Sequence, residues 1–174
     1  KFIQIREPGG SLNSEKIRKL ILNNKSTFNK NTDLLLYLSA RSENVELIKK
    51  NMNKKIILID RFVDSTLAYQ HYGMGIDLKL INIINKFLIK KIKVDFTFMH
   101  IVSNKNMNLR LSKRKKLNRY DKFKSSFYHN VQNGFNKILK KNPKQYMKIN
   151  SNLDINQNKK IILNKIDDLI LWKI

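Results

Sequence analysis

The run "KIILI", Lys55–Ile59, constrains the fold more than any other stretch of this sequence. After Lys55 it is continuously apolar, and polar residues bound it, which predicts a strand buried on both faces of a parallel sheet. Other runs rich in apolar residues predict further strands at residues 2–5, 96–102 and 145–149. Segments with apolar residues at helical spacing lie between them and at the C-terminus. This alternation predicts an α/β fold, in which a parallel sheet with right-handed crossovers is flanked by helices.

The helices are expected at residues 14–23, 32–50, 65–73, 77–90, 106–114 and 120–142. A C-terminal helix carries Ile161, Ile162, Ile166, Leu169 and Ile170. The sequence shows no internal repeat and no proline-rich linker. At 174 residues we expect one domain over 1–174.

Composition narrows the possible partners. The formal net charge is +23, which favours phosphate-bearing ligands, nucleic acid or an anionic membrane surface. Lysine is spread along the whole chain, however, and a uniform lysine coat is typical of a solvated surface. No secretory leader and no apolar run of roughly 18 residues is found. We therefore expect a cytoplasmic protein that does not enter the membrane.

Arginine is far rarer than lysine here and is more informative. A guanidinium is a planar, permanently charged fork that grips phosphates and base edges. Most of the arginines fall in segments that attract attention for other reasons. They are Arg6, Arg18, Arg41, Arg61, Arg110, Arg114 and Arg119.

Polar residues follow the predicted strands at the edge where α/β sheets bind ligands. "REPGG" follows the first strand, "DR" (Asp60 and Arg61) follows the second, and "SNKN" follows the third. A carboxylate there can hold Mg²⁺, directly or through water, and an adjacent arginine can neutralise a transferring phosphoryl group. The alternative for Asp60 is a strand-end acid that pairs with a neighbour, and "REPGG" taken alone is a turn.

Two further features each allow more than one interpretation. Tyr37 and Arg41 stand at i and i+4 of a predicted helix, so they could stack a base and hydrogen-bond its carbonyl edge. They could equally be a core-edge tyrosine and an arginine that snorkels from an apolar stripe. "RLSKRKKLNRYD", residues 110–121, holds three arginines and three lysines. It could be a lid over phosphates, a nucleic-acid helix or a solvated charge run.

The order of these motifs resembles a known family. "REPGGS", "LLLYLSARSENVE", "DRFVDSTLAYQHYGMG", "RLSKRKKLNRYD" and "FYHNVQNGF" are together similar to bacterial thymidylate kinases. The resemblance implies the parallel sheet of P-loop NTPases and nucleoside monophosphate kinases. It also implies transfer of the γ-phosphoryl group of ATP to dTMP, with Mg²⁺ as cofactor, and a homodimer.

The resemblance also implies roles for individual residues. Tyr37 matches the aromatic residue that stacks on thymine, and Arg41 the arginine that hydrogen-bonds the base. Arg61 matches the arginine that bridges donor and acceptor phosphates, and its neighbour Asp60 could hold Mg²⁺ through water. Arg6, Glu7 and Pro8 match the loop beside the dTMP phosphate and sugar. Ser65, Thr66, Tyr69 and Gln70 match the helix that lines the deoxynucleoside pocket. Arg110, Arg114 and Arg119 match a basic lid, around 110–122, that supplies charge to the transition state.

One family motif is missing from residues 1–174. No G-x-x-x-x-G-K-[ST] phosphate-binding loop occurs, and the family's first strand, the central one, would precede Lys1. We therefore expect an N-terminally truncated chain that lacks kinase activity by itself.

Two alternatives remain. The chain could be a degenerate nucleotide-binding remnant. It could also be a basic nucleic-acid-binding protein that uses residues 110–122, although that leaves "REPGG", Tyr37 with Arg41, and "DRFVDSTLAYQ" without a purpose.

Overall fold

The computed structural model describes residues 1–171. The chain divides into two compact units. The first comprises Lys1–Lys93 and Lys116–Asn136, and the second comprises Val94–Lys115 and the chain from Lys137 onward. The single domain expected over residues 1–174 stays a prediction.

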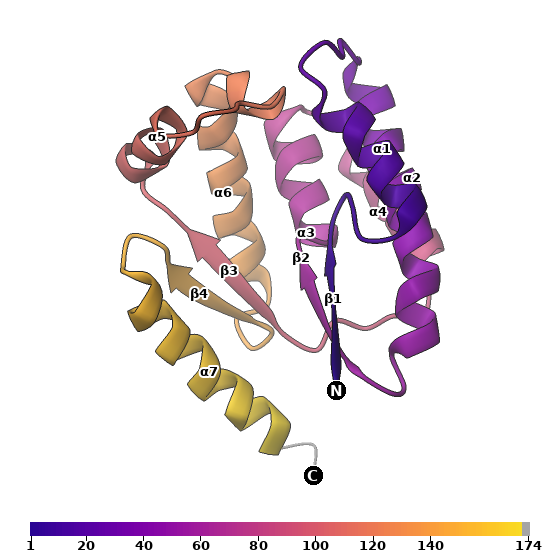
Figure 1. Ribbon diagram of the computed structural model, residues 1–174, viewed down its shortest axis with the longest axis vertical. Coiled ribbons are helices and arrows are strands. Elements are labelled where there is room, and N and C mark those ends of the chain that lie inside the picture. Colours follow the sequence, from indigo (N-terminus) through magenta and orange to yellow (C-terminus); the bar gives the residue numbers. More distant parts are fainter. Residues whose placement is uncertain (172–174) are drawn as a thin grey trace. The chain divides into compact units, whose positions relative to one another are not determined.

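The first unit is built on two parallel strands, β1 (Phe2–Arg6) and β2 (Ile56–Asp60) (Figure 1). Their register pairs Phe2 with Ile56 at one end and Arg6 with Asp60 at the other. Beyond the last pair, the Glu7 backbone N–H donates to the Asp60 carbonyl at 3.0 Å. The loop after β1 and the "DR" pair after β2 therefore emerge at the same edge, as expected for parallel strands.

The prediction that the Lys55–Ile59 run is buried on both faces is wrong for the part of the chain described. Ile56 and Leu58 are 51% and 43% exposed, whereas the alternate residues Ile57 and Ile59 are half-buried. Successive strand side chains point to opposite faces. One face of β2 is thus partly covered, while the other remains open in residues 1–171.

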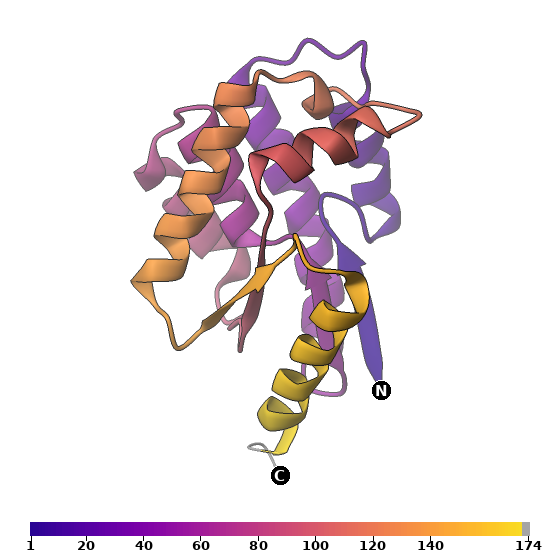
Figure 2. The same ribbon diagram turned by 90° about the vertical axis from the view of Figure 1, so that its left-hand side faces the viewer.

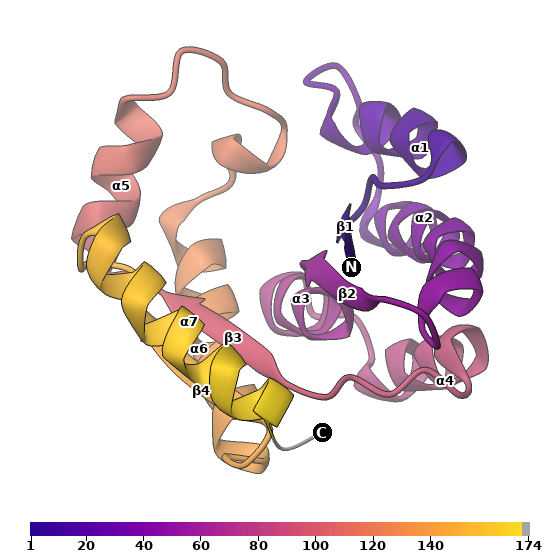
Figure 3. The same ribbon diagram turned by 60° about the horizontal axis from the view of Figure 1, so that its bottom comes forward.

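Three helices of this unit have side-chain caps that fix where they begin. α1 (Leu12–Leu22) begins after Ser11, α2 (Lys30–Asn51) after Asn29, and α4 (Leu78–Ile89) after Asp77. Each cap side chain accepts a backbone N–H of the first turn, which would otherwise have no partner. α1 packs against α2, and α2 against α4 (Figure 3). An apolar cluster of Leu34, Leu38, Ile76 and Ile81 lies among them.

The helix predicted at residues 65–73 has two parts. A short turn of α-helix, α3 (Val63–Thr66), continues into a π-helix, η1 (Leu67–Gly73). π-Helices are rare and often occur at functional sites. Tyr69 and Gln70 lie within this one.

The helix predicted at residues 120–142 begins later than expected. Tyr120–Lys122 form a single 3-10 turn, η2, and α6 runs from Ser125 to Lys141. Phe123 is extended (φ −69°, ψ 153°), which separates the two. Periodicity does not predict this break, because the apolar spacing continues across it.

The second unit has its own parallel pair, β3 (Thr97–Ile101) and β4 (Tyr146–Asn150), with Thr97 paired to Tyr146. α5 (Asn104–Ser112) follows β3 and α7 (Ile155–Leu171) follows β4 (Figure 2). The Lys165 ammonium lies 5.5 Å from the centre of the Phe96 ring, so α7 returns toward the start of β3. The predicted parallel strands are confirmed, as two pairs within the residues described.

Candidate functional site

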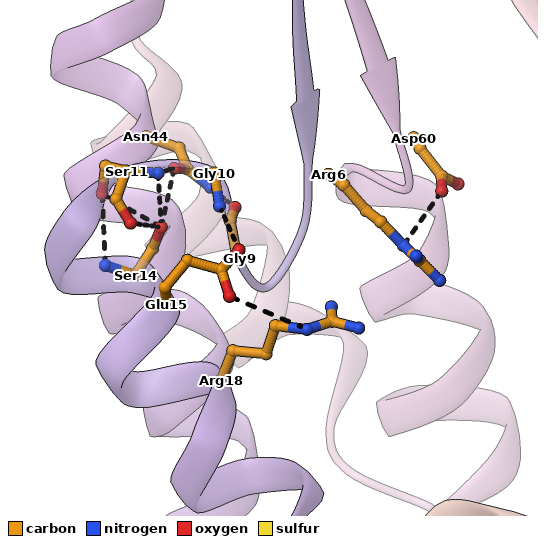
Figure 4. A network of polar contacts seen from close by, with 9 residues as sticks. All are labelled: Arg6, Gly9, Gly10, Ser11, Ser14, Glu15, Arg18, Asn44 and Asp60. Carbon is orange, nitrogen blue, oxygen red and sulfur yellow. Dashed lines mark hydrogen bonds and ion pairs between the residues drawn. The ribbon is translucent and has the colours of Figure 1, made fainter.

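Two groups of opposite charge meet at the edge where β1 and β2 end. Arg6 Nε lies 3.2 Å from Asp60 Oδ2, and their side chains are 63% and 54% exposed (Figure 4). Asp60 therefore does pair with a neighbour, as the alternative interpretation holds. An ion pair this exposed contributes little to stability because water competes for both groups. Either partner can exchange the other for a ligand at small cost.

Arg61 comes next and has an unusual backbone. Its φ is 66°, in the left-handed region that side chains other than glycine rarely adopt. The guanidinium carbon lies 5.2 Å from the centre of the Tyr69 ring. Strained residues of this kind cluster at ligand sites. The turn after β2 thus presents an exposed arginine above an aromatic ring.

A chain of edge-to-face aromatic contacts leads from Arg61 to the predicted base pocket. The Tyr69 and Tyr120 rings are 6.0 Å apart, and so are the Tyr120 and Tyr37 rings. Gln70 Nε2 also donates to the Tyr120 hydroxyl at 3.4 Å. Burial raises the pKa of Tyr37 to about 12. The structure therefore brings the predicted phosphate arginine and the predicted stacking tyrosine to one side of this unit.

Arg41 lies at the centre of a buried polar cluster. Only 1% of its side chain is exposed, so the snorkelling arginine of the alternative interpretation is wrong. Nε and Nη2 donate to Glu7 Oε2 at 3.0 and 2.6 Å. Nη2 also donates to Thr66 Oγ1 at 2.9 Å, and Nη1 donates to Asn85 Oδ1 at 2.7 Å. One guanidinium thus joins the loop after β1 to α2, α3 and α4.

Glu7 is almost as deeply buried as its partner, with 4% of its side chain exposed. Burial raises the pKa of its carboxyl group, and the charge of Arg41 opposes that effect only in part. Glu7 Oε1 and Asn85 Nδ2 are buried without a hydrogen-bond partner among the residues described. Buried polar groups are normally satisfied, so two such atoms in one cluster mark a place where a ligand or water can complete the set.

The remaining predicted dTMP residues lie in the same unit. Pro8 is buried after a cis peptide bond. Ser65 is half-buried on α3, and its backbone N–H donates to the Phe62 carbonyl. Thr66 and Gln70 are buried, at 2% and 1% exposure.

The predicted lid arginines divide between the two units. Arg110 and Arg114 belong to the second, where Arg110 Nη2 donates to the Ser151 carbonyl. Arg119 belongs to the first, where it forms an ion pair with the buried Asp33 and donates from Nε to the Ile21 carbonyl at 3.1 Å. The Tyr120 hydroxyl donates to the same aspartate. These contacts fix the end of the basic segment, and the role of all three arginines in catalysis stays a prediction.

Three buried polar residues were not predicted from the sequence: Asp33, Asn44 and Asn85. A signal for the first two exists: positions 33, 37, 41 and 44 of α2 are spaced by four, four and three. Side chains at this spacing share one helix face. Polar residues recurring there within an apolar helix indicate a buried polar site. Asn85 offers no such pattern.

No three His, Cys, Asp or Glu side chains are grouped as metal ligands within residues 1–171. In that same stretch, none of the helices is both long enough and apolar enough to cross a membrane.

Comparison with known proteins agrees with this geometry. The family described as "Thymidylate kinase" matches residues 1–162. A thymidylate kinase of Staphylococcus epidermidis is 33% identical over 87% of this chain and 75% of its own length. One from Mycoplasma capricolum is 36% identical over 97% of this chain and 83% of its own. The crystal structure of thymidylate kinase from Ehrlichia chaffeensis aligns with a TM-score of 0.75 and 33% identity, covering 95% of this chain and 80% of that one.

Parallel strands flanked by helices, together with this structural likeness, define the class: a P-loop NTPase fold of the nucleoside monophosphate kinase type. The chain belongs to the thymidylate kinase family.

Proposed function

We propose that this protein binds dTMP at the ends of β1 and β2 and transfers to it the γ-phosphoryl group of ATP, giving dTDP and ADP. The observation that carries the proposal is the buried Arg41 cluster. It joins three motifs of the family, the "REPGG" loop, the "LYLSAR" helix and the "DRFVDST" segment, through hydrogen bonds of 2.6–3.0 Å.

The base is recognised by Tyr37, Arg41 and Gln70. A guanidinium has five N–H groups, and the contacts described for Arg41 use four of them. The remaining Nη1–H donates to a carbonyl oxygen of thymine, whose ring stacks on Tyr37. Because Glu7, Thr66 and Asn85 hold the guanidinium in place, little side-chain entropy is lost when it meets the base.

The sugar and phosphate lie over the rim formed by Arg6, Glu7 and Pro8. Arg6 exchanges Asp60 for the dTMP phosphate, and Tyr69 with Ser65 lines the sugar. Glu7 Oε1, which has no partner among the residues described, accepts a sugar hydroxyl. Each contact orients the phosphate oxygen that attacks in line, which is the larger part of catalysis in phosphoryl transfer.

Arg61 bridges the phosphates of donor and acceptor and neutralises charge that develops between them. The exposed Asp60 fits a magnesium ion held through water, because Mg²⁺ in kinases is bound by one or two carboxylates plus substrate phosphates. When bound, the ion would neutralise phosphate charge beside Arg61. The lid arginines Arg110, Arg114 and Arg119 belong to the same proposal, as do the homodimer and a cytoplasmic location.

The test is ADP production with dTMP, with dUMP and without acceptor. It is run on a protein that is extended at its N-terminus to include a phosphate-binding loop, since residues 1–174 hold no such motif. We expect ADP release that depends on dTMP. Release that is unchanged by omission of dTMP contradicts the proposal.

A further inference from the structure

We propose that Asn44 is a positioning residue that holds the dTMP loop, Arg6–Ser11, in the shape that places it beside the nucleotide phosphate. The inference rests on the proposed function and adds a residue to it. Asn44 lies on α2, one turn beyond Arg41, and is completely buried. Its side chain hydrogen-bonds the loop at Gly9 and Ser11 and also acts on the Glu7 carboxyl group.

Both the nitrogen and the oxygen of the Asn44 side-chain amide hydrogen-bond the loop (Figure 4). Nδ2 donates to the Gly9 carbonyl at 2.8 Å, while Oδ1 accepts the Ser11 backbone N–H at 3.1 Å. Oδ1 also accepts the Ser14 hydroxyl at 3.1 Å. A donor and an acceptor are both required, and only an amide side chain of this length supplies them together.

The part of the loop at Gly9 and Gly10 needs such an anchor because glycine has no side chain to fix it. Gly10 has a φ of +124°, which favours glycine. A Cβ added to Gly10 would lie 2.9 Å from Asn44 Oδ1 and 2.8 Å from Ile5 Cγ2, so the backbone passes very close to the amide. Two successive glycines cost conformational entropy when ordered, and the hydrogen bonds to Asn44 offset it.

α1 adds a second set of contacts to the same loop. Ser11 and Ser14 form a reciprocal cap at the start of the helix, and the Gly10 N–H donates to Glu15 Oε1 at 3.0 Å. Asn44 is the group that ties this cap to α2, because Ser14 Oγ and Ser11 N both reach its Oδ1. The loop is therefore held against α2 and not only against its own helix.

The consequence is that α2 sets the distance between the part of the site that binds the base and the part that binds the phosphate. Tyr37 and Arg41 serve the base, and Asn44, three residues on, sets the loop that meets the phosphate. A rise of about 1.5 Å per residue puts Asn44 about 10 Å along the helix from Tyr37. Loss of Asn44 should therefore weaken recognition of the phosphate more than recognition of the base.

The test compares binding of dTMP and thymidine by calorimetry. Asn44→Asp keeps the size and the acceptors but loses the donor to Gly9 and adds a charge; Asn44→Leu fills the space with neither. We expect both variants to bind dTMP at least about tenfold more weakly while thymidine affinity changes less than about threefold. Ser39→Ala is the control, since its exposed hydroxyl donates only to Leu35 of the same helix.

An equal loss for both ligands, or no loss for either, overturns the inference while leaving the proposed function intact. Wild-type protein that binds neither ligand overturns both. Hydrogen exchange at the Ser11 amide gives a ligand-free readout, because this N–H donates to Asn44 Oδ1 at 3.1 Å as well as to Ser14 Oγ at 2.8 Å. Exchange should be slow in the wild type and at least about tenfold faster in Asn44→Leu, because residues 9–11 then lose their hydrogen bonds to α2. Equal exchange in the two proteins also overturns the inference.

Discussion

Two ion pairs involve adjacent residues at the end of β1, Arg6 and Glu7. They differ in burial and in the number of hydrogen bonds they make. Glu7 and Arg41 are 4% and 1% exposed, whereas Arg6 and Asp60 are 63% and 54% exposed. In the first pair, Arg41 also donates hydrogen bonds to Thr66 and Asn85, while the second pair faces solvent. The buried pair therefore defines the shape of the site, and the exposed pair remains available for exchange with an anion.

The energies expected for the two pairs follow from this difference. Removal of one partner of a buried pair leaves an uncompensated charge, which typically costs about 3–5 kcal/mol. Removal of one partner of an exposed pair costs about 0–1 kcal/mol. Substitution in the buried pair should therefore lower stability strongly. Substitution in the exposed pair should weaken ligand binding with little loss of stability.

Replacement of Arg41 should have the largest effect. Arg41→Met leaves Glu7 buried without its partner, so the free energy of unfolding should fall by about 3–5 kcal/mol in urea titrations. The double variant Arg41→Met with Glu7→Leu should recover part of the loss, because no buried charge then remains. If the single variant loses less than about 1 kcal/mol, the buried pair does not define the site.

Replacement of Arg61 should reduce turnover without much loss of stability. In the protein extended upstream, Arg61→Ala should lower the rate of ADP formation by about 10²–10³-fold, since an arginine that stabilises phosphoryl-transfer charge is worth at least that much. The midpoint of thermal unfolding should change by only a few degrees, because the side chain is exposed. Near-normal turnover refutes the role assigned to Arg61.

Replacement of Arg6 should weaken recognition of the phosphate without affecting recognition of the nucleoside. Arg6→Ala should weaken dTMP binding by about tenfold, the value of one charged hydrogen bond, and leave thymidine binding unchanged. The free energy of unfolding should change by less than about 1 kcal/mol. Arg18, whose ion pair with Glu15 is long at 4.0 Å, gives a matched arginine of the same unit for comparison of stability alone.

The smallest expected effect is the loss of stability at alkaline pH when Tyr37 ionises. The folded pKa of Tyr37, about 12, lies above its ordinary value of 10. The folded state thus keeps this proton longer, so the contribution to stability is complete below pH 10 and is lost as the pH rises through 12. Difference absorbance at 295 nm between wild type and Tyr37→Phe should place this ionisation near pH 12. A midpoint near 10 means that the ring is not buried.

Periodicity was sufficient to predict the strand and helix order, because each strand and each capped helix carries a local signature. The same signal failed at Phe123, where one extended residue ends η2 without changing the apolar spacing. It also misjudged Ile56 and Leu58, since an apolar run does not reveal what covers each face. The spacing of Tyr37 and Arg41 and the order of motifs were sufficient to single these two residues out, and their roles toward the base stay predictions. Asn85 could not be singled out, because nothing local distinguishes a buried asparagine from the exposed ones of an asparagine-rich chain.

The most direct test of the site is the relative affinity of this chain for dTMP and dCMP by calorimetry. Thymine presents a carbonyl oxygen where cytosine presents an amino group, and the remaining N–H of Arg41 can donate only to the former. A buried donor left facing another donor costs at least about tenfold in affinity. We predict that dTMP binds at least about tenfold more tightly than dCMP. Equal affinities would contradict the placement of the base against Tyr37 and Arg41.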